Sequence, residues 1–270
     1  MAYIYWNANP ELFHLGAFAV RWYGLFFALL FTIGYWIARW EFRVEGKDLR
    51  SLDALLLYMV AGSIMGARLG HCFFYDPRFY LSHPLEILEV WHGGLASHGG
   101  AIGILVVLYF HTRRHPDQPY LWLLDRIVVP TALGGAIIRL ANLFNSEIIG
   151  TPTHVPWAFV FLQVDRVPRH PAQLYESIAY LLIFIGLLSV YRRLRSKTPR
   201  GLLLGLFLST MFFARFLIEF VKEHQAAYGH NFPLKVGQWL SIPFIIAGVL
   251  LVWRACRGRP WRGPAVAEQA

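Results

Sequence analysis

Five arginines lie within stretches of this chain that are otherwise apolar enough to span a membrane. They are Arg21, Arg68, Arg126, Arg139 and Arg215. A guanidinium does not lose its proton in proteins, so within a bilayer it needs a partner, a cavity or an anionic ligand. Placing one arginine at the centre of a spanning helix costs roughly 2.5 kcal/mol or more. These arginines are therefore the first candidates for an anion-binding site.

The densest group of polar residues begins at Arg139. Asn142 lies three residues further on and shares its helix face, and Asn145 and Glu147 follow where that helix is expected to end. Two amides, a carboxylate and a guanidinium at a membrane boundary are costly unless they form a network or meet a polar ligand. The cluster therefore predicts either a structural network that closes the helix end or a site for a polar head group. Gly150 ends the segment.

A glycine-rich segment, residues 92–103, contains the second candidate. It holds five glycines around His98 and starts at His92. Glycines allow backbone to approach another backbone or a ligand closely. A histidine titrates near neutral pH and can act as a general base, although a lone histidine is more often a hydrogen-bonded packing residue. Because His98 is expected at the same membrane level as Arg139, we treat it as a catalytic candidate.

Two further patches complete the set. Arg215 and Glu219 lie four residues apart on one helix face, which fits an internal ion pair or an arginine that Glu219 orients towards an anion. In the segment 170–176, Pro171 suits a helix start, and Gln173 and Glu176 are expected to serve the first-turn amides. Tyr23 fits either the site or the belt of aromatic residues at a membrane interface.

The composition indicates a polytopic membrane protein. Of the 270 residues, 56% are hydrophobic, and the mean hydropathy is +0.44. A spanning helix needs about 20 apolar residues. Seven stretches approach that length, and we expect a single all-α membrane domain over residues 1–270. The stretches are 17–39, 52–74, 94–111, 120–141, 173–191, 201–221 and 236–253.

Basic residues set the predicted orientation. With the N-terminus outside, inward segments hold fifteen Lys and Arg residues and outward segments hold five. This bias predicts an outside N-terminus and a cytoplasmic C-terminus, with a basic tail over approximately 254–270. The outward segment of approximately 142–172 should form a small head, with strand character over 155–164. Cys72 and Cys256 fall near opposite faces, so we expect no disulfide between them.

Taken together, these patches resemble the prolipoprotein diacylglyceryl transferase family. The resemblance covers residues 21–220, and the pattern Arg-x-x-Asn-x-x-Asn-x-Glu-x-x-Gly over 139–150 is its most specific part. Further matching stretches are 21–24, 66–70, 93–100, 170–176 and 214–220. The chain departs from the family at Ser146, where glycine is usual between the second asparagine and the glutamate. The polar groups are retained.

The resemblance implies a multi-pass enzyme of the bacterial inner membrane that acts in lipoprotein biosynthesis. It implies transfer of an sn-1,2-diacylglyceryl group from phosphatidylglycerol to the lipobox cysteine of a prolipoprotein signal peptide. The products are a thioether and glycerol 1-phosphate, with no cofactor, metal or nucleic acid. His98, Arg139 and Arg215 are the expected catalytic residues. The expected substrate-binding residues are Arg139, Asn142, Asn145, Glu147, Gly150, Tyr23 and Glu219.

Other functions fit parts of the same pattern. Intramembrane arginines and glycine-interrupted helices also line anion pathways, so a transporter or channel for an anionic solute is the main alternative. The transporter hypothesis predicts polar groups in both halves of the membrane, whereas the polar groups of this chain are expected to concentrate near the outer face. An inactive homologue that binds lipoproteins is a second alternative. No serine–histidine or paired-aspartate arrangement indicates an intramembrane protease.

Overall fold

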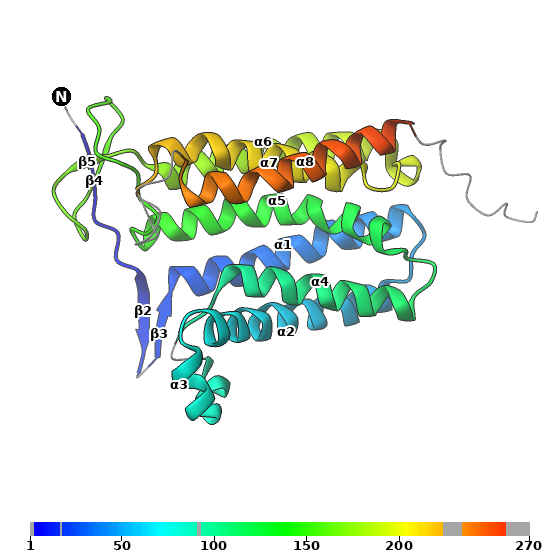
Figure 1. Cartoon of the computed structure of the whole chain (residues 1–270), viewed down its shortest axis with the longest axis horizontal. Helices are drawn as coiled ribbons and strands as arrows, with labels where there is room; N and C mark the ends of the chain where they lie inside the picture. Colours follow the sequence, from blue (N-terminus) through cyan, green and yellow to red (C-terminus); the bar gives the residue numbers. More distant parts are fainter. Residues whose placement is uncertain (1–2, 17, 91–92, 224–233, 258–270) are drawn as a thin grey trace, which may run out of the picture. The chain divides into compact units, whose positions relative to one another are not determined.

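Most of the described chain is helical. The computed structural model describes residues 3–16, 18–90, 93–223 and 234–257 (Figure 1). It divides into two compact units: residues 1–37 with 125–270, called unit 1, and residues 38–124, called unit 2. Among the described residues, six helices are long and apolar enough to cross a membrane. They are α1 (Trp22–Val44), α2 (Leu49–Phe74), α5 (Tyr120–Phe144), α6 (Ala172–Leu194), α7 (Leu202–Ile218) and α8 (Val236–Arg257).

Each of the seven predicted stretches contains a helix. The third corresponds to α4 (Ser97–Arg114), which is helical but is not among the six. The first helix begins later than predicted, because the strand β3 (Phe18–Arg21) precedes it. Arg21 therefore ends a strand instead of lying inside a spanning helix, and its side chain is 67% exposed with Nη2 3.5 Å from Glu11 Oε1. The prediction that Arg21 lies within a span was wrong.

Unit 1 contains two small sheets. In the first, the order is β1 (Ile4–Trp6), β4 (Phe159–Phe161) and β5 (Pro168–Arg169). β1 runs parallel to β4, with Ile4 opposite Phe159, and β5 is antiparallel to β4. β4 is buried along its whole length, which confirms the strand character predicted within 155–164. β2 (Glu11–Leu15) pairs antiparallel with β3.

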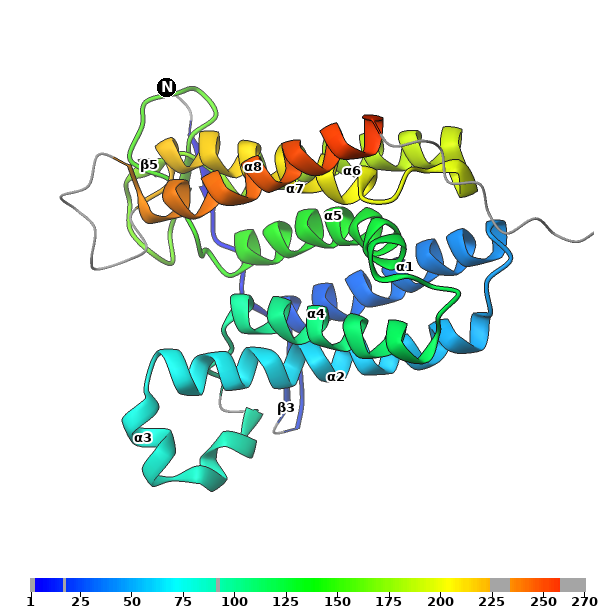
Figure 2. The ribbon, with the colours of Figure 1, turned by 45° about the vertical axis from the view of Figure 1, so that its right-hand side comes forward.

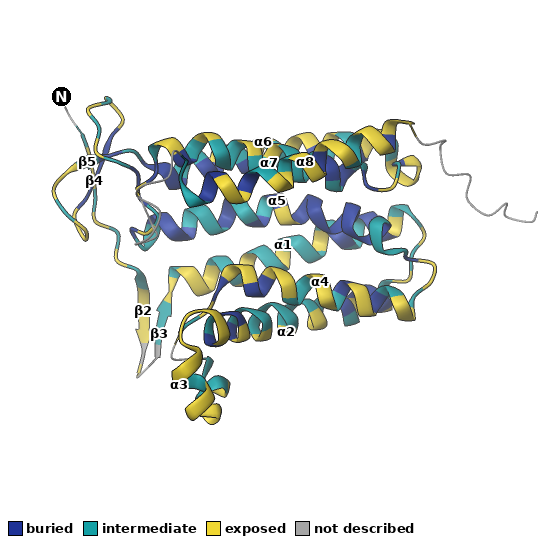
Figure 3. Ribbon diagram, in the orientation of Figure 1, coloured by how far each residue is buried: buried dark blue, intermediate teal, exposed yellow. Residues whose placement is uncertain are grey.

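The helices of unit 1 pack closely. α7 lies against α8, and α6 lies against α7 (Figures 1 and 2). A Cβ on Gly205 would come within 2.8 Å of the Gly248 carbonyl oxygen, so these glycines set the close crossing of α7 and α8. α5 is the most buried of the six apolar helices, with 56% of its apolar span buried (Figure 3).

Asp125 and Arg126 on α5 are both fully buried. The Asp125 carboxylate accepts hydrogen bonds from the backbone N–H groups of Gly201 (2.6 Å) and Leu204 (2.9 Å), at the start of α7. Arg126 lies 5.5 Å from the centroid of the Tyr191 ring, and its Nη1 is 3.9 Å from Asp125 Oδ2. The two residues hold α5, α6 and α7 together, so Arg126 has a structural role and does not snorkel to water.

Unit 2 is built on the pair α2–α4, which lie side by side (Figure 2). A Cβ on Gly103 would come 2.1 Å from the Gly62 carbonyl oxygen, and one on Gly99 would come 2.3 Å from that of Gly66. The glycines therefore allow α2 and α4 to pack closely against each other. α3 (Pro77–Ser82) and the 3-10 turn η1 (Pro84–Leu88) follow α2. His92 lies outside the described residues.

Arg68 on α2 is buried and bound by backbone. Its Nη2 donates to the Glu86 carbonyl (2.6 Å), its Nε to that of Ile87 (3.1 Å) and its Nη1 to that of Gly93 (2.6 Å). The guanidinium also stacks on Tyr80, 5.1 Å from the ring centroid. This arginine ties η1 and Gly93, which follow α3, to α2 through their backbone carbonyls.

Candidate active site

The predicted cluster at the end of α5 is a connected hydrogen-bond network. Arg139 Nη1 donates to Asn142 Oδ1 (3.0 Å), and Asn142 Nδ2 donates to Glu147 Oε2 (3.1 Å). Asn145 Nδ2 donates to the other carboxylate oxygen, Glu147 Oε1 (3.2 Å). Four of the predicted site residues, which include one carboxylate and one guanidinium, are therefore connected by hydrogen bonds within unit 1. The Asn145 Oδ1 atom is buried without a hydrogen-bond partner among the described residues.

A second carboxylate meets Arg139 from α6. Glu176 is fully buried, and its Oε2 lies 2.8 Å from Arg139 Nε. The two groups form an ion pair. The same carboxylate lies 3.3 Å from Lys222 Nζ and 3.4 Å from the Tyr180 hydroxyl. Gln173 and Glu176 were expected to serve the first-turn amides of α6; Gln173 donates instead to the Glu147 carbonyl (2.6 Å).

Lys222 joins two buried carboxylates. Its side chain is 2% exposed, and Nζ lies 3.4 Å from Glu219 Oε2 as well as 3.3 Å from Glu176 Oε1. Glu219 is also packed against Gly237, where a Cβ would come 2.6 Å from the carboxylate. The chain of charges thus runs from Arg139 through Glu176 and Lys222 to Glu219. Such a buried ionic chain is stable only while every member is paired.

Arg215, which is half-buried, differs from the buried cations described above. Within the described part of the chain, Glu219 pairs with Lys222 and forms no ion pair with Arg215. The Arg215 Nε atom is buried and has no hydrogen-bond partner there. A buried guanidinium N–H that lacks an acceptor costs free energy, and an anion at this position would remove that cost.

The loop after Asn145 holds a strained backbone. Ser146 (φ 53°) and Ile148 (φ 57°) both adopt left-handed conformations, which are rare for a non-glycine residue and rarer for a β-branched one. Gly150 then passes so close to neighbouring backbone that a Cβ would lie 2.4 Å from the His170 carbonyl oxygen and 2.7 Å from that of Val221. The surrounding packing must hold this loop in place, as is common at functional sites.

Aromatic residues from the N-terminal segment support this end of α5. Trp6 Nε1 donates to the Leu143 carbonyl (2.9 Å), and the Trp6 ring lies 5.6 Å from that of Phe144. Trp22 and Phe26 of α1 also contact Phe144, with centroid distances of 4.6 and 5.6 Å. The sheet strand β1 and the start of α1 therefore fix the helix end that carries Asn142 and the Glu147 loop.

The remaining predicted residues are placed as follows. Tyr23 on α1 is 36% exposed and lies within electrostatic range of Glu147 and Arg139. His98 belongs to unit 2, at the second residue of α4, where its exposed ring contacts Phe74 and Tyr75 with centroid distances of 5.7 and 6.0 Å. The role of His98 as a base stays a prediction.

Outside the spanning helices, the segment that leads into α6 carries its own charges. Arg169 is bound by Asp165 (Nη2 to Oδ2, 2.6 Å) and by Glu223 (Nη1 to Oε1, 3.1 Å). The Arg169 guanidinium holds the pKa of the Asp165 carboxyl below its usual range. Burial lowers the pKa of His170, whose Nδ1 lies 3.1 Å from the Tyr175 hydroxyl. His170 therefore favours the neutral form.

Sequence reasoning missed Lys222 and misjudged Glu176. Lys222 was counted only as a positive charge outside the membrane, yet it is among the most buried side chains of the described residues. The spacing Glu219-x-x-Lys222, three residues on a helical turn, was a signal that could have indicated the pair. The charged partners of Glu176 lie 37 and 46 positions away in the chain, so no local spacing could reveal them.

Comparisons with known proteins identify the family to which this chain is similar. Residues 10–254 match the family model described as prolipoprotein diacylglyceryl transferase. The chain is 55% identical over 256 residues to the phosphatidylglycerol–prolipoprotein diacylglyceryl transferase of Chloroherpeton thalassium, covering 95% of this chain and 96% of that relative. The enzyme of the same name from Tolumonas auensis is 49% identical, covering 92% and 96%. The one from Bacteroides fragilis is 44% identical, covering 93% and 94%.

The chain belongs to the prolipoprotein diacylglyceryl transferase family. The matched range of residues 10–254 spans the chain positions of Arg139, Glu219 and His98. With six apolar helices of membrane-spanning length, this member of the transferase family is a multi-span membrane protein. The resemblance inferred from the sequence motifs is confirmed.

Proposed function

We propose that this chain transfers the sn-1,2-diacylglyceryl group of phosphatidylglycerol to the lipobox cysteine thiol of a prolipoprotein. The observation that carries the proposal is family membership over residues 10–254, together with 55% identity over 256 residues to an enzyme named for this reaction. This family membership makes both alternatives, a solute transporter and an inactive binding homologue, weaker interpretations. The reaction forms one carbon–sulfur bond and breaks one carbon–oxygen bond, releasing glycerol 1-phosphate.

Arg139 and Arg215 hold the donor phosphate in this proposal. Negative charge grows on the phosphate oxygens as the carbon–oxygen bond breaks, so guanidinium donors aimed at them bind the transition state more strongly than the ground state. The buried Nε of Arg215 without a partner supports a role for this residue. The Glu176 carboxylate, tied to Lys222, orients Arg139. Glu219 fixes Lys222 from the other side.

The head group of the lipid is oriented by Asn142, Asn145 and Glu147. The buried Asn145 oxygen without a partner can accept a hydrogen bond from a glycerol hydroxyl. Tyr23 supports the same region, and Gly150 keeps the neighbouring loops close.

His98 takes the proton of the acceptor thiol. A free cysteine thiol has a pKa near 8.5, so at neutral pH it needs a base or a positive field to become the nucleophilic thiolate. The thiolate then attacks the glyceryl carbon that carries the phosphate, and the phosphate leaves with the bond electrons. If H98Q kept full activity and an unchanged pH profile, the base would have to be another group.

The membrane arrangement is part of the proposal. The positive-inside bias supports seven spans with α4 as the third, an outside N-terminus and a cytoplasmic C-terminus. Residues 142–172, which carry β4 and β5, then form a head outside the inner membrane of a bacterial cell. This places the Arg139 network in the outer half of the bilayer, where a diacylated substrate and an extended signal peptide can both reach it.

In the deciding experiment, purified protein is incubated with phosphatidylglycerol and a lipobox peptide, and the mass of the peptide is measured by mass spectrometry. The expected result is a mass gain of one diacylglyceryl group, with none on a peptide whose cysteine is replaced by serine. No mass gain from folded protein contradicts the proposal. A counterflow assay in liposomes tests the transporter alternative, because solute flux without lipid consumption would favour it.

A further inference from the structure

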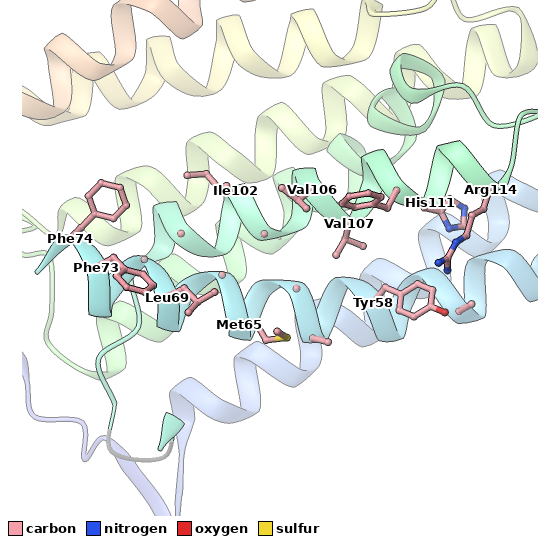
Figure 4. A pocket seen from close by; sticks show the side chains of 18 of the residues that line it. Tyr58, Met65, Leu69, Phe73, Phe74, Ile102, Val106, Val107, His111 and Arg114 are labelled. Atoms are coloured by element: carbon pink, nitrogen blue, oxygen red, sulfur yellow. The ribbon is translucent and has the colours of Figure 1, made fainter. Parts of the chain in front are cut away.

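A groove runs along the α2–α4 pair of unit 2 and has a volume of about 680 Å³ (Figure 4). Glycines on both helices line it, including Gly62, Gly66 and Gly103. Because these glycines carry no side chain, the backbones of the two helices approach closely along the seam. The volume lies within the range of about 300–1,000 Å³ that is usual for ligand sites.

The walls of the groove are apolar side chains that remain exposed. Met65 is 62% exposed, Phe73 is 48% exposed and Ile102 is 55% exposed. From Ala54 to Phe74 the groove follows about 30 Å of α2, at roughly 1.5 Å per residue, which equals the thickness of a bilayer core. Its dimensions and lining therefore suit a long hydrocarbon chain.

The groove has one charged end. His111, Arg114 and His115 line it there, whereas Phe73 and Phe74 lie at the opposite end (Figure 4). Arg114 is exposed at the last residue of α4. The nearby Asp117 carboxylate is bound by Lys47, with Nζ 3.2 Å from Oδ2, so it is already paired. The charged end is cationic, and it carries hydrogen-bond donors that suit a phosphate.

We propose that this groove binds an anionic membrane phospholipid, with one acyl chain along the α2–α4 seam and the phosphate on Arg114. Basic pockets between membrane helices at the cytoplasmic side are known to attract anionic head groups. None of the residues assigned above to the transferase reaction lines the groove. The site is therefore an additional lipid site, and it does not depend on the proposed reaction.

Charge decides between this occupant and an apolar peptide helix. A signal peptide also offers a long apolar segment, but its N-terminal region is positively charged. In the proposed orientation that region would lie at the same membrane face as Arg114, and like charges repel. An anionic head group is attracted there.

The test is photo-crosslinking of the purified full chain with lipids that carry a diazirine on one acyl chain. Phosphatidylserine is the anionic probe, and phosphatidylcholine with the same chains is the neutral probe. Labelled peptides are mapped by mass spectrometry, which separates the groove (residues 54–74 and 99–115) from the rest of the protein. We expect phosphatidylserine to label groove peptides about fivefold more than phosphatidylcholine, since one arginine near a membrane surface contributes that factor. High salt should reduce the preference.

Matched variants make the result specific. R114Q should abolish the preference, whereas R113Q should keep it, because Arg113 does not line the groove and lies over the Tyr109 ring. M65W should fill the groove and lower labelling by both lipids. L105W, at an exposed position of α4 outside the groove, should not. Unchanged thermal unfolding verifies that each variant is folded.

Three results would overturn the proposal. The first is equal labelling of groove peptides by the two lipids in the unmodified protein. The second is an equal loss of preference in R113Q and R114Q, which would indicate general surface charge. The third is displacement of both lipids by a synthetic apolar peptide with a basic N-terminus that binds more strongly to R114Q. That result would assign the groove to a peptide.

Discussion

Arg68 and Arg139 are both arginines of apolar helices, but they are satisfied in different ways. The backbone carbonyls of Glu86, Ile87 and Gly93 accept hydrogen bonds from the Arg68 guanidinium. Side chains surround Arg139: Asn142 and, through an ion pair, Glu176. A backbone cradle cannot open without unfolding the local chain, whereas side-chain partners can rotate to admit a ligand. A buried arginine held by side chains is therefore the better candidate for substrate binding than one held by backbone.

The largest expected effect is on Arg139. R139K should lower the rate of diacylglyceryl transfer by about 100-fold or more, because a lysine cannot reproduce a fixed pair of N–H donors towards developing charge. Mass spectrometry of a lipobox peptide measures the rate, and thermal unfolding should change little. R166K, at an exposed arginine of the same unit, is the control. Near-normal transfer by R139K would contradict the assignment of Arg139 to substrate binding and of Arg68 to a structural role.

Lys222 tests whether the network around Arg139 acts as one unit. K222M leaves the Glu176 and Glu219 carboxylates without their shared cation, and breaking a buried pair costs about 3–5 kcal/mol. We expect a lower unfolding temperature together with weaker phosphatidylglycerol binding, measured as a raised KM. The double variant K222M/E219Q should recover part of the stability. If K222M unfolded like the unmodified protein, Lys222 would be peripheral to the site.

Arg68 should show the opposite pattern from Arg139. R68Q removes the hydrogen bonds to the partly buried carbonyls of Glu86 and Ile87 and to that of Gly93, and should lower the free energy of unfolding by about 3 kcal/mol. The transfer rate per folded molecule should stay near normal. Denaturant titration and the rate normalised to folded protein give the two quantities. A variant that is stable but inactive would place Arg68 in the reaction.

The strained loop beside Asn145 permits a gain of stability. Ser146 combines a left-handed backbone with a buried hydroxyl that lacks a hydrogen-bond partner among the described residues. S146G removes both costs and should raise the free energy of unfolding by about 1 kcal/mol. No gain would mean that the packing of Glu147 and Ile148 sets the strain on its own.

The smallest effect concerns pH. Burial lowers the pKa of His170 from its usual 6.5, so the unfolded chain takes up a proton first as the pH falls. The fold should therefore lose stability from about pH 6.5 downward, until the folded state also protonates. Denaturant midpoints measured between pH 8 and pH 5 should fall less in H170Q than in the unmodified chain. Parallel curves would show that His170 does not contribute.

The sequence predicted much of the fold because long apolar stretches and the strand of residues 159–161 carry local patterns. It failed where structure depends on distant partners. β1 is three residues long and gains its strand character from β4, and Arg21 was assigned to a helix because its neighbours are apolar. Arg139, Asn142 and Glu147 were predicted together because they are close in sequence. Glu176 and Lys222 reach them only through the packing of separate helices.

The parallel pairing of β1 with β4 has a consequence for biosynthesis. Ile4 can pair with Phe159 only after the ribosome has added about 150 further residues. At ordinary elongation rates this takes roughly 8–30 s. During that interval the first strand has no hydrogen-bonding neighbour, and Trp6 has not met Leu143. Completing the helix end that carries Asn142 therefore requires a segment made much earlier to return and contact it. A bulky fusion placed before residue 4 should delay that step more than one placed after residue 257.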